Sequence, residues 1–348
     1  MKTLEQAIKL FSLEDFDCHE VEDHEGGRNR IFICSKDGVK KFVLRISATG
    51  DRSENDYLAE AEFVRYLAKN GAPVADVIPS TNGKLVEVLD GNVTDLVAAG
   101  DDSSIDSFAT PVFLSLFEYA KGMLLADNAY RYREGAPLTE YFFNTGKTLG
   151  KIHALSKGFE PTADHHRPDY FDKYNMEYLG RLIPDEYSEL KSAIAARLET
   201  FHTLPTDPQS YGLVHFDFSD GNYHIDMTTG NITVFDFDNC LYCWYIFDLA
   251  NLWLHNEGWT RQEPDPGKRF KLMQQCFDLQ LQGYKTETEV PDELLEKLPL
   301  FIDMVLIENI VDEFECTARE GEEVDYEDIE DAAECLIHEI PYAGIGKF

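Results

Sequence analysis

Five polar side chains late in the chain have the types and spacing of a reactive site. His215 and Asp217 follow an apolar, strand-like run, and Asn222 comes five residues after Asp217. Asp236 and Asp238 close the next apolar run. Carboxylate and amide oxygens are the ligands that Mg²⁺ accepts, and phosphate and water oxygens complete its shell. The stretch therefore indicates metal-assisted chemistry at a phosphate, with the Asp217 carboxylate left to act on the substrate.

A predicted hairpin positions two of these residues. Segments 223–225 and 231–235 have the pattern of short strands around the turn 226–230. The two outer ends of a hairpin lie side by side, so we expect Asn222 and Asp236 at the same end. This arrangement would give a hard cation two oxygen ligands from the protein.

The first third of the chain has the pattern of a sheet with one main helix. In segment 41–46 every second residue is apolar, which places Arg45 on the opposite face of a strand. A helix over 53–70 carries Glu60 in the register of its apolar residues. A carboxylate on an apolar face needs a partner, and Arg45 is the obvious one. The other expected strands are 18–21, 30–34, 85–88 and 112–117, with a hairpin turn at 35–38.

Helical periodicity dominates the rest of the chain. Strand signals return there only in the block that contains the polar residues. We therefore predict two domains, 1–120 and 121–348, with the boundary near 118–122. The expected helices cover 138–155, 187–204, 269–283 and 294–316.

The order His-x-Asp, four residues, Asn, then Asp-Phe-Asp resembles the catalytic core of the aminoglycoside phosphotransferase and choline kinase family, which includes homoserine-kinase-type relatives. These protein-kinase-like enzymes phosphorylate small molecules, and the resemblance covers about 15–253. It implies an α+β, protein-kinase-like bilobal fold. The small antiparallel-sheet lobe, with one main helix, would bind nucleotide, and the larger, mostly helical lobe would hold the catalytic loop and the acceptor.

The resemblance also implies roles for the polar residues. Asp217 would accept or orient the proton of the attacking hydroxyl, as the catalytic base. Asn222 and Asp236 would complete the catalytic set by binding Mg²⁺. Three residues would support them: His215 by bracing the catalytic loop, Asp238 as a weaker candidate for a second ion or the substrate, and Asp248 by anchoring the loop from a helix.

The nucleotide, ATP or GTP, would bind to the first lobe. Arg45, paired with Glu60, stands where the wider superfamily usually has a lysine that contacts the phosphates, and arginine can bind them with two donors. The remaining contacts implied by the resemblance are Gly26, Gly27 and Asn29 in a loop over the phosphates, and Glu118 and Ala120 at a hinge that reads the base.

The sequence departs from the family pattern in ways that bear on the acceptor. Phe216 stands where the family commonly has glycine, and Ser219 where it commonly has histidine. Segment 237–247 is too short to form the peptide-docking surface of a protein kinase. We therefore expect a small hydroxyl-bearing acceptor, such as an aminoglycoside, amino alcohol, homoserine or sugar-like compound.

The composition of the chain limits the classes of molecule that it can bind. The net charge of −34 argues against a nucleic-acid or anionic-lipid partner, because both require clustered lysine and arginine. Residues 291–348 hold 18 acids against three bases, which favours a cationic acceptor. No apolar stretch approaches the length of a membrane span, and seven scattered cysteines do not resemble a disulfide framework. These features indicate a cytoplasmic protein; the oligomeric state leaves no signature.

Two other functions remain open on the sequence. Arg45, Phe216 and Ser219 are substitutions of the kind that accompany lost activity, so one alternative is a catalytically impaired, nucleotide-binding pseudokinase. A remote alternative is a non-haem Fe(II) oxygenase that uses His215 and Asp217 as two members of a facial triad.

Three smaller patterns have a structural interpretation. The Cys240–Cys243 pair lies among apolar residues and favours core cysteines over a zinc site. His153 is expected to be a satisfied buried histidine. Glu308, Asp312 and Glu315 share one face of a predicted helix, where they form a solvated stripe or, as the less favoured alternative, hold an amine-bearing substrate.

Overall fold

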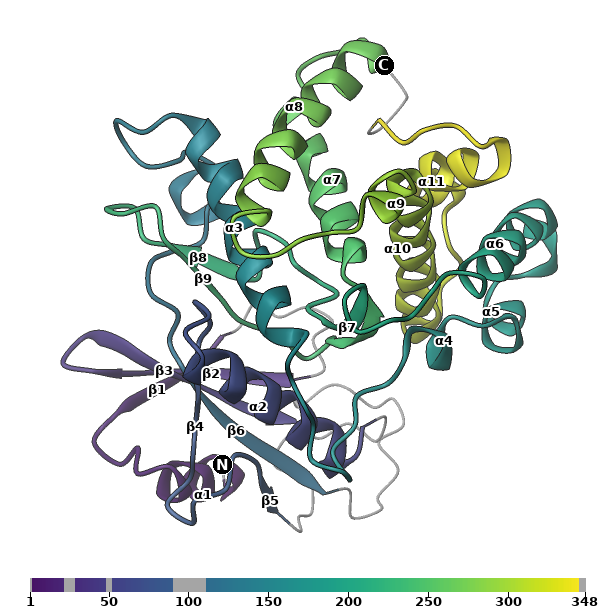
Figure 1. Ribbon diagram of the computed structural model, residues 1–348. Coiled ribbons are helices and arrows are strands. Elements are labelled where there is room, and N and C mark those ends of the chain that lie inside the picture. The colour runs from purple at the N-terminus through teal and green to yellow at the C-terminus, as the bar shows by residue number, and fades with distance from the viewer. Residues whose placement is uncertain (1, 22–28, 48–51, 90–110, 344–348) are drawn as a thin grey trace. The chain divides into compact units, whose positions relative to one another are not determined.

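The computed structural model describes residues 2–21, 29–47, 52–89 and 111–343 and divides into two compact units (Figure 1). Each unit is discontinuous in sequence, and the segment that carries Asp236 and Asp238 belongs to the same unit as Arg45. Unit 1 comprises Met1–Lys121, Phe159–Arg167 and Thr233–Asp238, and unit 2 comprises Gly122–Gly158, Pro168–Ile232 and Asn239–Phe348.

Unit 1 is built on a six-stranded sheet in which every pairing is antiparallel. The strand order is β1-β2-β3-β6-β4, and β5 also pairs with β6. The elements, in chain order, are α1 (Lys2–Leu10), β1 (Asp17–Glu20), β2 (Asn29–Lys36), β3 (Val39–Ser47), α2 (Glu54–Lys69), β4 (Val77–Ile78), β5 (Glu87–Leu89) and β6 (Val112–Glu118).

The two faces of this sheet have different partners. Leu44 and Leu114 pack in one buried cluster with Phe11, which follows α1. Phe113, the next position on β6, packs in a second cluster with Tyr57 of α2. Successive side chains of a strand point to opposite faces, so α1 and α2 cover opposite faces of the sheet. The face that meets α2 is therefore the one on which Arg45 lies.

Local signals explain where several of these elements begin and end. Ser53 and Asp56 form the predicted capping box at the start of α2, and Asn70 is its C-cap. Asp37 and Gly38 both have a positive φ, as a two-residue turn between β2 and β3 requires. Helix α1 is an element for which we drew no expectation from the sequence.

A disulfide joins β1 to β2. Cys18 and Cys34 occupy directly opposite positions in the antiparallel pairing, and the structure links their sulfur atoms. The sequence carries no framework of paired cysteines, and this single bond depends on strand register, which cysteine spacing alone does not reveal.

Unit 2 consists mainly of helices. The elements are η2 (Ala126–Asn128), α3 (Leu138–Ser156), α4 (Tyr170–Lys173), α5 (Met176–Leu182), η3 (Asp185–Tyr187), α6 (Ser188–Phe201), β7 (Tyr211–Val214), β8 (Tyr223–Ile225), β10 (Leu241–Trp244), α7 (Ile246–Thr260), α8 (Pro266–Tyr284), α9 (Asp292–Leu295), α10 (Leu298–Glu320) and α11 (Tyr326–His338). The predicted α+β fold, with a sheet-based first unit and a mostly helical second one, is confirmed.

Helices α3 and α8 pack with their backbones in contact (Figure 1). A Cβ atom at Gly146 would lie 1.8 Å from the carbonyl oxygen of Gln280, and one at Gly283 would lie 1.9 Å from that of Phe143. No side chain fits at either position, so glycine is required for this close approach. Helix α7 packs against α8 and α10 and carries Asp248 into the interior.

Two short strand pairs hold the predicted polar block. Strand β7 pairs with β10, and β8 pairs with β9 (Ile232–Val234) around the predicted turn at 226–230. The turn is closed by the Gly230 N–H, which donates to the Asp226 carbonyl at 2.7 Å. Within the described ranges, no helix has the length and hydropathy of a membrane span.

Candidate active site

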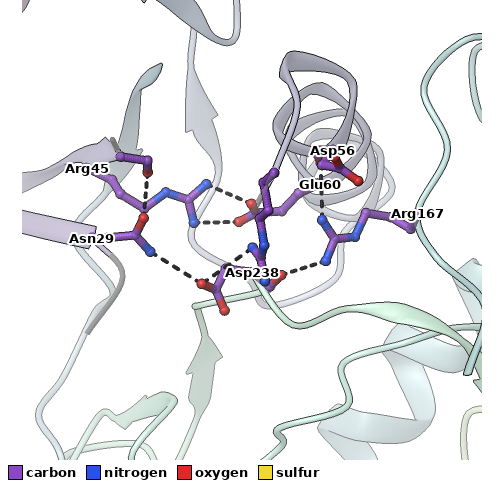
Figure 2. Close-up of polar contacts among 8 residues, drawn as sticks. Asn29, Arg45, Asp56, Glu60, Arg167 and Asp238 are labelled. Carbon is purple, nitrogen blue, oxygen red and sulfur yellow. Dashed lines mark hydrogen bonds and ion pairs between the residues drawn. The ribbon is translucent and has the colours of Figure 1, made fainter. Parts of the chain in front are cut away.

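Arg45 of β3 and Glu60 of α2 form a buried ion pair in unit 1 (Figure 2). Arg45 Nη1 donates to Glu60 Oε1 at 2.8 Å, and Nη2 donates to Oε2 at 2.7 Å. Arg45 is 4% exposed and Glu60 is 1% exposed. This two-donor geometry matches the planar fork of arginine to the carboxylate, as the sequence predicted for the pair.

The surroundings of Arg45 explain why a buried guanidinium is stable there. Burial alone would lower the pKa of Arg45, but the Glu60 carboxylate, supported by Asp238 and Asp236, raises it above its usual value. The guanidinium also lies over the ring of Phe117, 5.0 Å from the ring centre. Arg45 therefore remains charged throughout the physiological pH range.

The Nε donor of Arg45 is not used by this pair. Among the described residues, no hydrogen-bond acceptor lies within reach of its buried Nε atom. A buried N–H without a partner is costly, and a bound phosphate oxygen would satisfy it. This donor is therefore chemically suited to the phosphate contact that the resemblance implies for Arg45.

Asp238 contacts three further polar residues of unit 1 (Figure 2). Asn29 Nδ2 donates to Asp238 Oδ2 at 3.3 Å, and Arg52 Nη1 lies 3.5 Å from the same oxygen. Arg167, which is 3% exposed, donates from Nη2 to the Asp238 carbonyl at 2.6 Å and from Nη1 to the Asp56 carbonyl at 3.3 Å.

Arg52 and Arg167 were not anticipated from the sequence. Arg52 follows segment 48–51, which lies outside the described residues, and Arg167 lies in a polar loop more than 100 residues later. Neither has a motif around it, so only the folded structure reveals that they flank the Asp-Phe-Asp segment. Together with Arg45 they form a cluster of cations in a strongly acidic chain.

Asp236, the proposed metal ligand of unit 1, has an unusual backbone. Its φ is +60°, in the left-handed region that residues with a Cβ atom adopt at a cost. Its side chain is exposed, and its carboxylate acts electrostatically on Arg45. Backbone strain of this kind concentrates at functional sites, where the surrounding structure maintains it.

The loop of unit 2 that carries Asp217 is anchored by a buried carboxylate. Asp248 of α7 accepts the backbone N–H groups of His215 at 2.9 Å and of Phe216 at 3.0 Å, one on each carboxylate oxygen. His153 Nε2 lies 3.0 Å from the same carboxylate, and His153 Nδ1 lies 2.9 Å from the Tyr284 hydroxyl. Asp248 and His153 are both 0% exposed. Asp248 thus fixes the backbone immediately before Asp217, and the prediction that His153 is a satisfied buried histidine is confirmed.

The backbone and packing of Phe216 explain how this residue can replace the glycine of the family pattern. Its φ is +73°, the conformation for which glycine is the usual residue. A phenylalanine pays about 1–2 kcal/mol to adopt this backbone. Its buried ring stacks on Phe247, with ring centres 4.5 Å apart and planes 5° from parallel, and this packing offsets the cost.

Asn222 closes the loop that Asp217 begins. Its side-chain Nδ2 donates to the Asp217 carbonyl at 2.9 Å, so the amide is oriented by the loop itself. With Nδ2 used in this way, the remaining Oδ1 atom is the one chemically suited to a hard cation. His215, in the same loop, is 0% exposed, which agrees with a bracing role rather than with direct contact to substrate.

The predicted hinge and phosphate loop are placed only in part. Glu118 ends β6 and donates its N–H to the Asp76 carbonyl at 2.8 Å, and the next N–H, of Tyr119, donates to the Lys41 carbonyl at 2.8 Å. Ala120 is buried. Gly26 and Gly27 lie outside the described residues, whereas Asn29 begins β2 and contacts Asp238.

The cysteine pair has the structural role that was expected. Cys240 and Cys243 are both 0% exposed, and burial raises the pKa of Cys243 well above its usual value. A raised pKa disfavours the thiolate that metal binding and redox chemistry require. Over the part of the chain that the structure describes, no group of three His, Cys, Asp or Glu side chains is arranged to hold a metal ion.

The chain matches the phosphotransferase enzyme family over residues 20–279, which is most of its length. Among curated proteins it is similar to the amicoumacin kinase of Bacillus subtilis (strain 168), with 27% identity over 274 residues that cover 79% of this chain and 74% of that protein. The resemblance inferred from the His-x-Asp and Asp-Phe-Asp segments is therefore confirmed.

Solved structures show the same fold. An amicoumacin kinase in complex with AMP-PNP, Ca²⁺ and Ami superposes with a TM-score of 0.75 at 22% identity, covering 98% of this chain and 93% of that one. A microcompartment-associated aminopropanol kinase superposes with a TM-score of 0.67 at 16% identity, covering 99% of both chains.

Proposed function

The chain belongs to the phosphotransferase enzyme family and is a small-molecule kinase, and we propose that it transfers the γ-phosphate of ATP to a hydroxyl group of its acceptor with the help of Mg²⁺. The observation that carries this proposal is the anchored loop. Asp248 holds the two backbone N–H groups before Asp217, and Asn222 holds the carbonyl of Asp217 itself. A catalytic carboxylate fixed in this way pays little reorganisation cost during the reaction.

In the proposed reaction the acceptor O–H gives its proton to the Asp217 carboxylate as its oxygen attacks the γ-phosphorus. The bond between the γ-phosphorus and the bridging oxygen breaks, and ADP leaves. Arg45, held by Glu60, contributes positive charge and its unused Nε donor to the nucleotide phosphates. In this assignment Arg45 replaces the lysine that is usual in the superfamily, and it can bind the phosphates with two donors.

Asn222 and Asp236 are the residues that we assign to the metal. The fit rests on the oriented Asn222 amide and on the exposed Asp236 carboxylate at a strained backbone. When bound, Mg²⁺ would neutralise charge on the transferred phosphate. The relative solved with AMP-PNP and Ca²⁺ supports a nucleotide with a divalent cation here. A cytoplasmic location remains part of the proposal.

The test is a coupled assay of ADP formation. The full chain is incubated with ATP or GTP, with and without Mg²⁺, and with a panel of amino alcohols, aminoglycosides, homoserine and sugars. The variant Asp217→Asn should lower kcat by about 10²–10⁴-fold, the range expected for a positioned base. Asp278→Asn, the same change on the exposed surface of α8, is the matched control and should keep the wild-type rate.

The same assay decides between the proposal and the pseudokinase alternative. ATP binding without acceptor-dependent ADP formation would support the pseudokinase, and equal activity of Asp217→Asn and the wild type would refute the role of Asp217. The family match and the two-unit fold decide against the iron-oxygenase alternative, which needs a double-stranded barrel.

A further inference from the structure

A hydroxyl group without a partner lies in the interior of unit 2. Tyr170 of α4 is 0% exposed, and among the described residues no hydrogen-bond partner lies within reach of its Oη atom. Burying a hydroxyl without a partner costs about 1–3 kcal/mol, so such a group calls for an explanation. The titratable groups that act on this hydroxyl are the Cys243 thiol and the Glu308 carboxyl group of α10.

The Tyr170 ring belongs to an aromatic stack that reaches the catalytic loop. It stacks on Tyr174, with ring centres 4.5 Å apart and planes 13° from parallel. Both tyrosines contact Phe216, with ring centres 6.5 and 5.9 Å away. Phe216 immediately precedes Asp217, so this buried stack extends inward from the loop that carries the proposed catalytic base.

The carboxylates of α10 differ in how they are satisfied. Glu315 accepts a hydrogen bond from the Tyr178 hydroxyl at 2.5 Å and pairs with Lys173 at 2.9 Å. Asp312 is exposed to solvent. Glu308 is partly buried, and within the described part of the chain its carboxyl group has no ion pair or hydrogen bond. The helix face that the sequence presented as one stripe therefore contains a structural, a solvated and an unsatisfied carboxyl group.

The environment of Glu308 is strongly negative. Burial, followed by the charges of Asp312 and Asp217, raises the pKa of Glu308 to about 8, and Lys173 opposes this only in part. Because Asp217 acts on Glu308, a ligand at Glu308 would lie on the catalytic side of α10. A cationic group bound here would relieve the repulsion among these carboxylates.

We propose that Tyr170 and Glu308 bind an ammonium group of the acceptor while its hydroxyl group lies at Asp217. This inference rests on the proposed kinase function and names its acceptor class as hydroxyl compounds that carry a primary amine. An ammonium has three N–H donors, which suit the Glu308 carboxylate and the lone pair of the Tyr170 hydroxyl. It would give both of the unsatisfied groups a partner.

The ring faces of the stack are a less suitable place for the cation. One face of Tyr174 is covered by Tyr170, and the Lys173 ammonium already lies 5.3 Å from the Tyr174 ring centre. The binding elements that remain are the polar groups, the hydroxyl and the carboxyl. The structure thus favours recognition of an amine that still carries N–H donors over recognition of a quaternary ammonium.

The experiment compares acceptors and variants of the full chain. Each amine acceptor of the panel is assayed beside its N-acetyl derivative, and Glu308→Gln and Tyr170→Phe are assayed beside the wild type. Glu313→Gln is the matched control, because it removes the same charge from the same helix, and its backbone carbonyl but not its carboxylate is engaged by Thr317. Thermal unfolding of each variant checks that it is folded.

We expect Glu308→Gln to raise KM for amine acceptors by about 10- to 100-fold, the loss of one charge-assisted hydrogen bond. Tyr170→Phe should raise it by about 3- to 10-fold, the loss of a weaker one. The values of kcat should change little, because the contact is the same in the ground and transition states. Acetylated acceptors should be poor substrates of the wild type and insensitive to either variant. Acceptor binding at pH 7 should also release a proton from Glu308, seen by calorimetry in buffers of different ionisation enthalpy.

Equal KM values for Glu308→Gln and Glu313→Gln, or equal turnover of amines and their acetyl derivatives, would overturn the inference while leaving the kinase function intact. Absence of ADP formation with every acceptor would instead refute the proposed function. In that event calorimetry with 1-amino-2-propanol as probe decides the site: binding weakened by Glu308→Gln but not by Glu313→Gln supports it, and any other result rejects it.

Discussion

Replacing Glu60 by glutamine tests the buried ion pair most directly. The change keeps the shape of the side chain but removes its charge, and it turns one of the two acceptors of Arg45 into an amide donor. The two hydrogen bonds at 2.8 and 2.7 Å are lost or distorted, and the guanidinium, 4% exposed, remains in the interior. Breaking one partner of a buried pair costs about 3–5 kcal/mol.

The structure places the expected cost at the lower end of this range. Asp236 and Asp238 also act on Arg45 and would compensate part of its charge after the change. We therefore expect a loss of about 3 kcal/mol in the free energy of unfolding, a large fraction of the 5–15 kcal/mol that is typical of proteins. The released Arg45 fork should also raise KM for ATP.

The matched control lies on the same helix. Glu62→Gln changes a contact of equal length, 2.8 Å from Glu62 Oε1 to His165 Nδ1, but the two side chains are 26% and 20% exposed. A pair of this kind contributes about 0–1 kcal/mol. Urea unfolding of the wild type and both variants measures the difference. A loss below about 1 kcal/mol for Glu60→Gln, or one no larger than for Glu62→Gln, would refute the argument that burial makes this pair essential.

Two further predictions concern unit 2. Gly146→Ala should lower the free energy of unfolding by about 3 kcal/mol, the upper end for overpacking, because its Cβ atom would meet the Gln280 carbonyl. Its control, Gly258→Ala, lies in open space on α7 and should raise the free energy of unfolding by about 0.5–1 kcal/mol. Urea unfolding measures both, and equal effects would contradict the close contact. Burial lowers the pKa of His153, so the unfolded chain binds a proton first and stability should fall as the pH drops below about 6.5. His153→Gln should remove part of that fall in melting temperature between pH 7.5 and 5, with His255 contributing another part, and an unchanged slope would contradict it.

Local signals allowed much of unit 1 to be predicted. The alternation of β3 placed Arg45 on the face that meets α2, and the register of α2 placed Glu60 opposite it. The capping box at Ser53 fixed the start of that helix. Each of these features depends on residues within a few positions of one another, where chain geometry leaves few alternatives.

The features that escaped prediction depend on contacts between distant segments. Arg52 and Arg167 meet Asp238 only because separate loops converge on it, and Cys18 meets Cys34 only through strand register. The sequence likewise shows three equivalent acids on one face of α10, whereas in the structure Tyr178 and Lys173 satisfy only Glu315. Spacing along one helix reveals a face but not its partners.

The left-handed backbone at Phe216 has a consequence for how relatives of this enzyme are recognised. A search pattern that demands glycine between the histidine and the aspartate would pass over this chain, although its backbone adopts the conformation that glycine serves elsewhere. What the loop requires is a value of φ, and a large aromatic residue can meet that requirement where a second ring, here Phe247, lies parallel to it. Genomes searched with the relaxed pattern, and with an aromatic residue required at the position of Phe247, should therefore yield enzymes of this kind that a glycine-based definition misses.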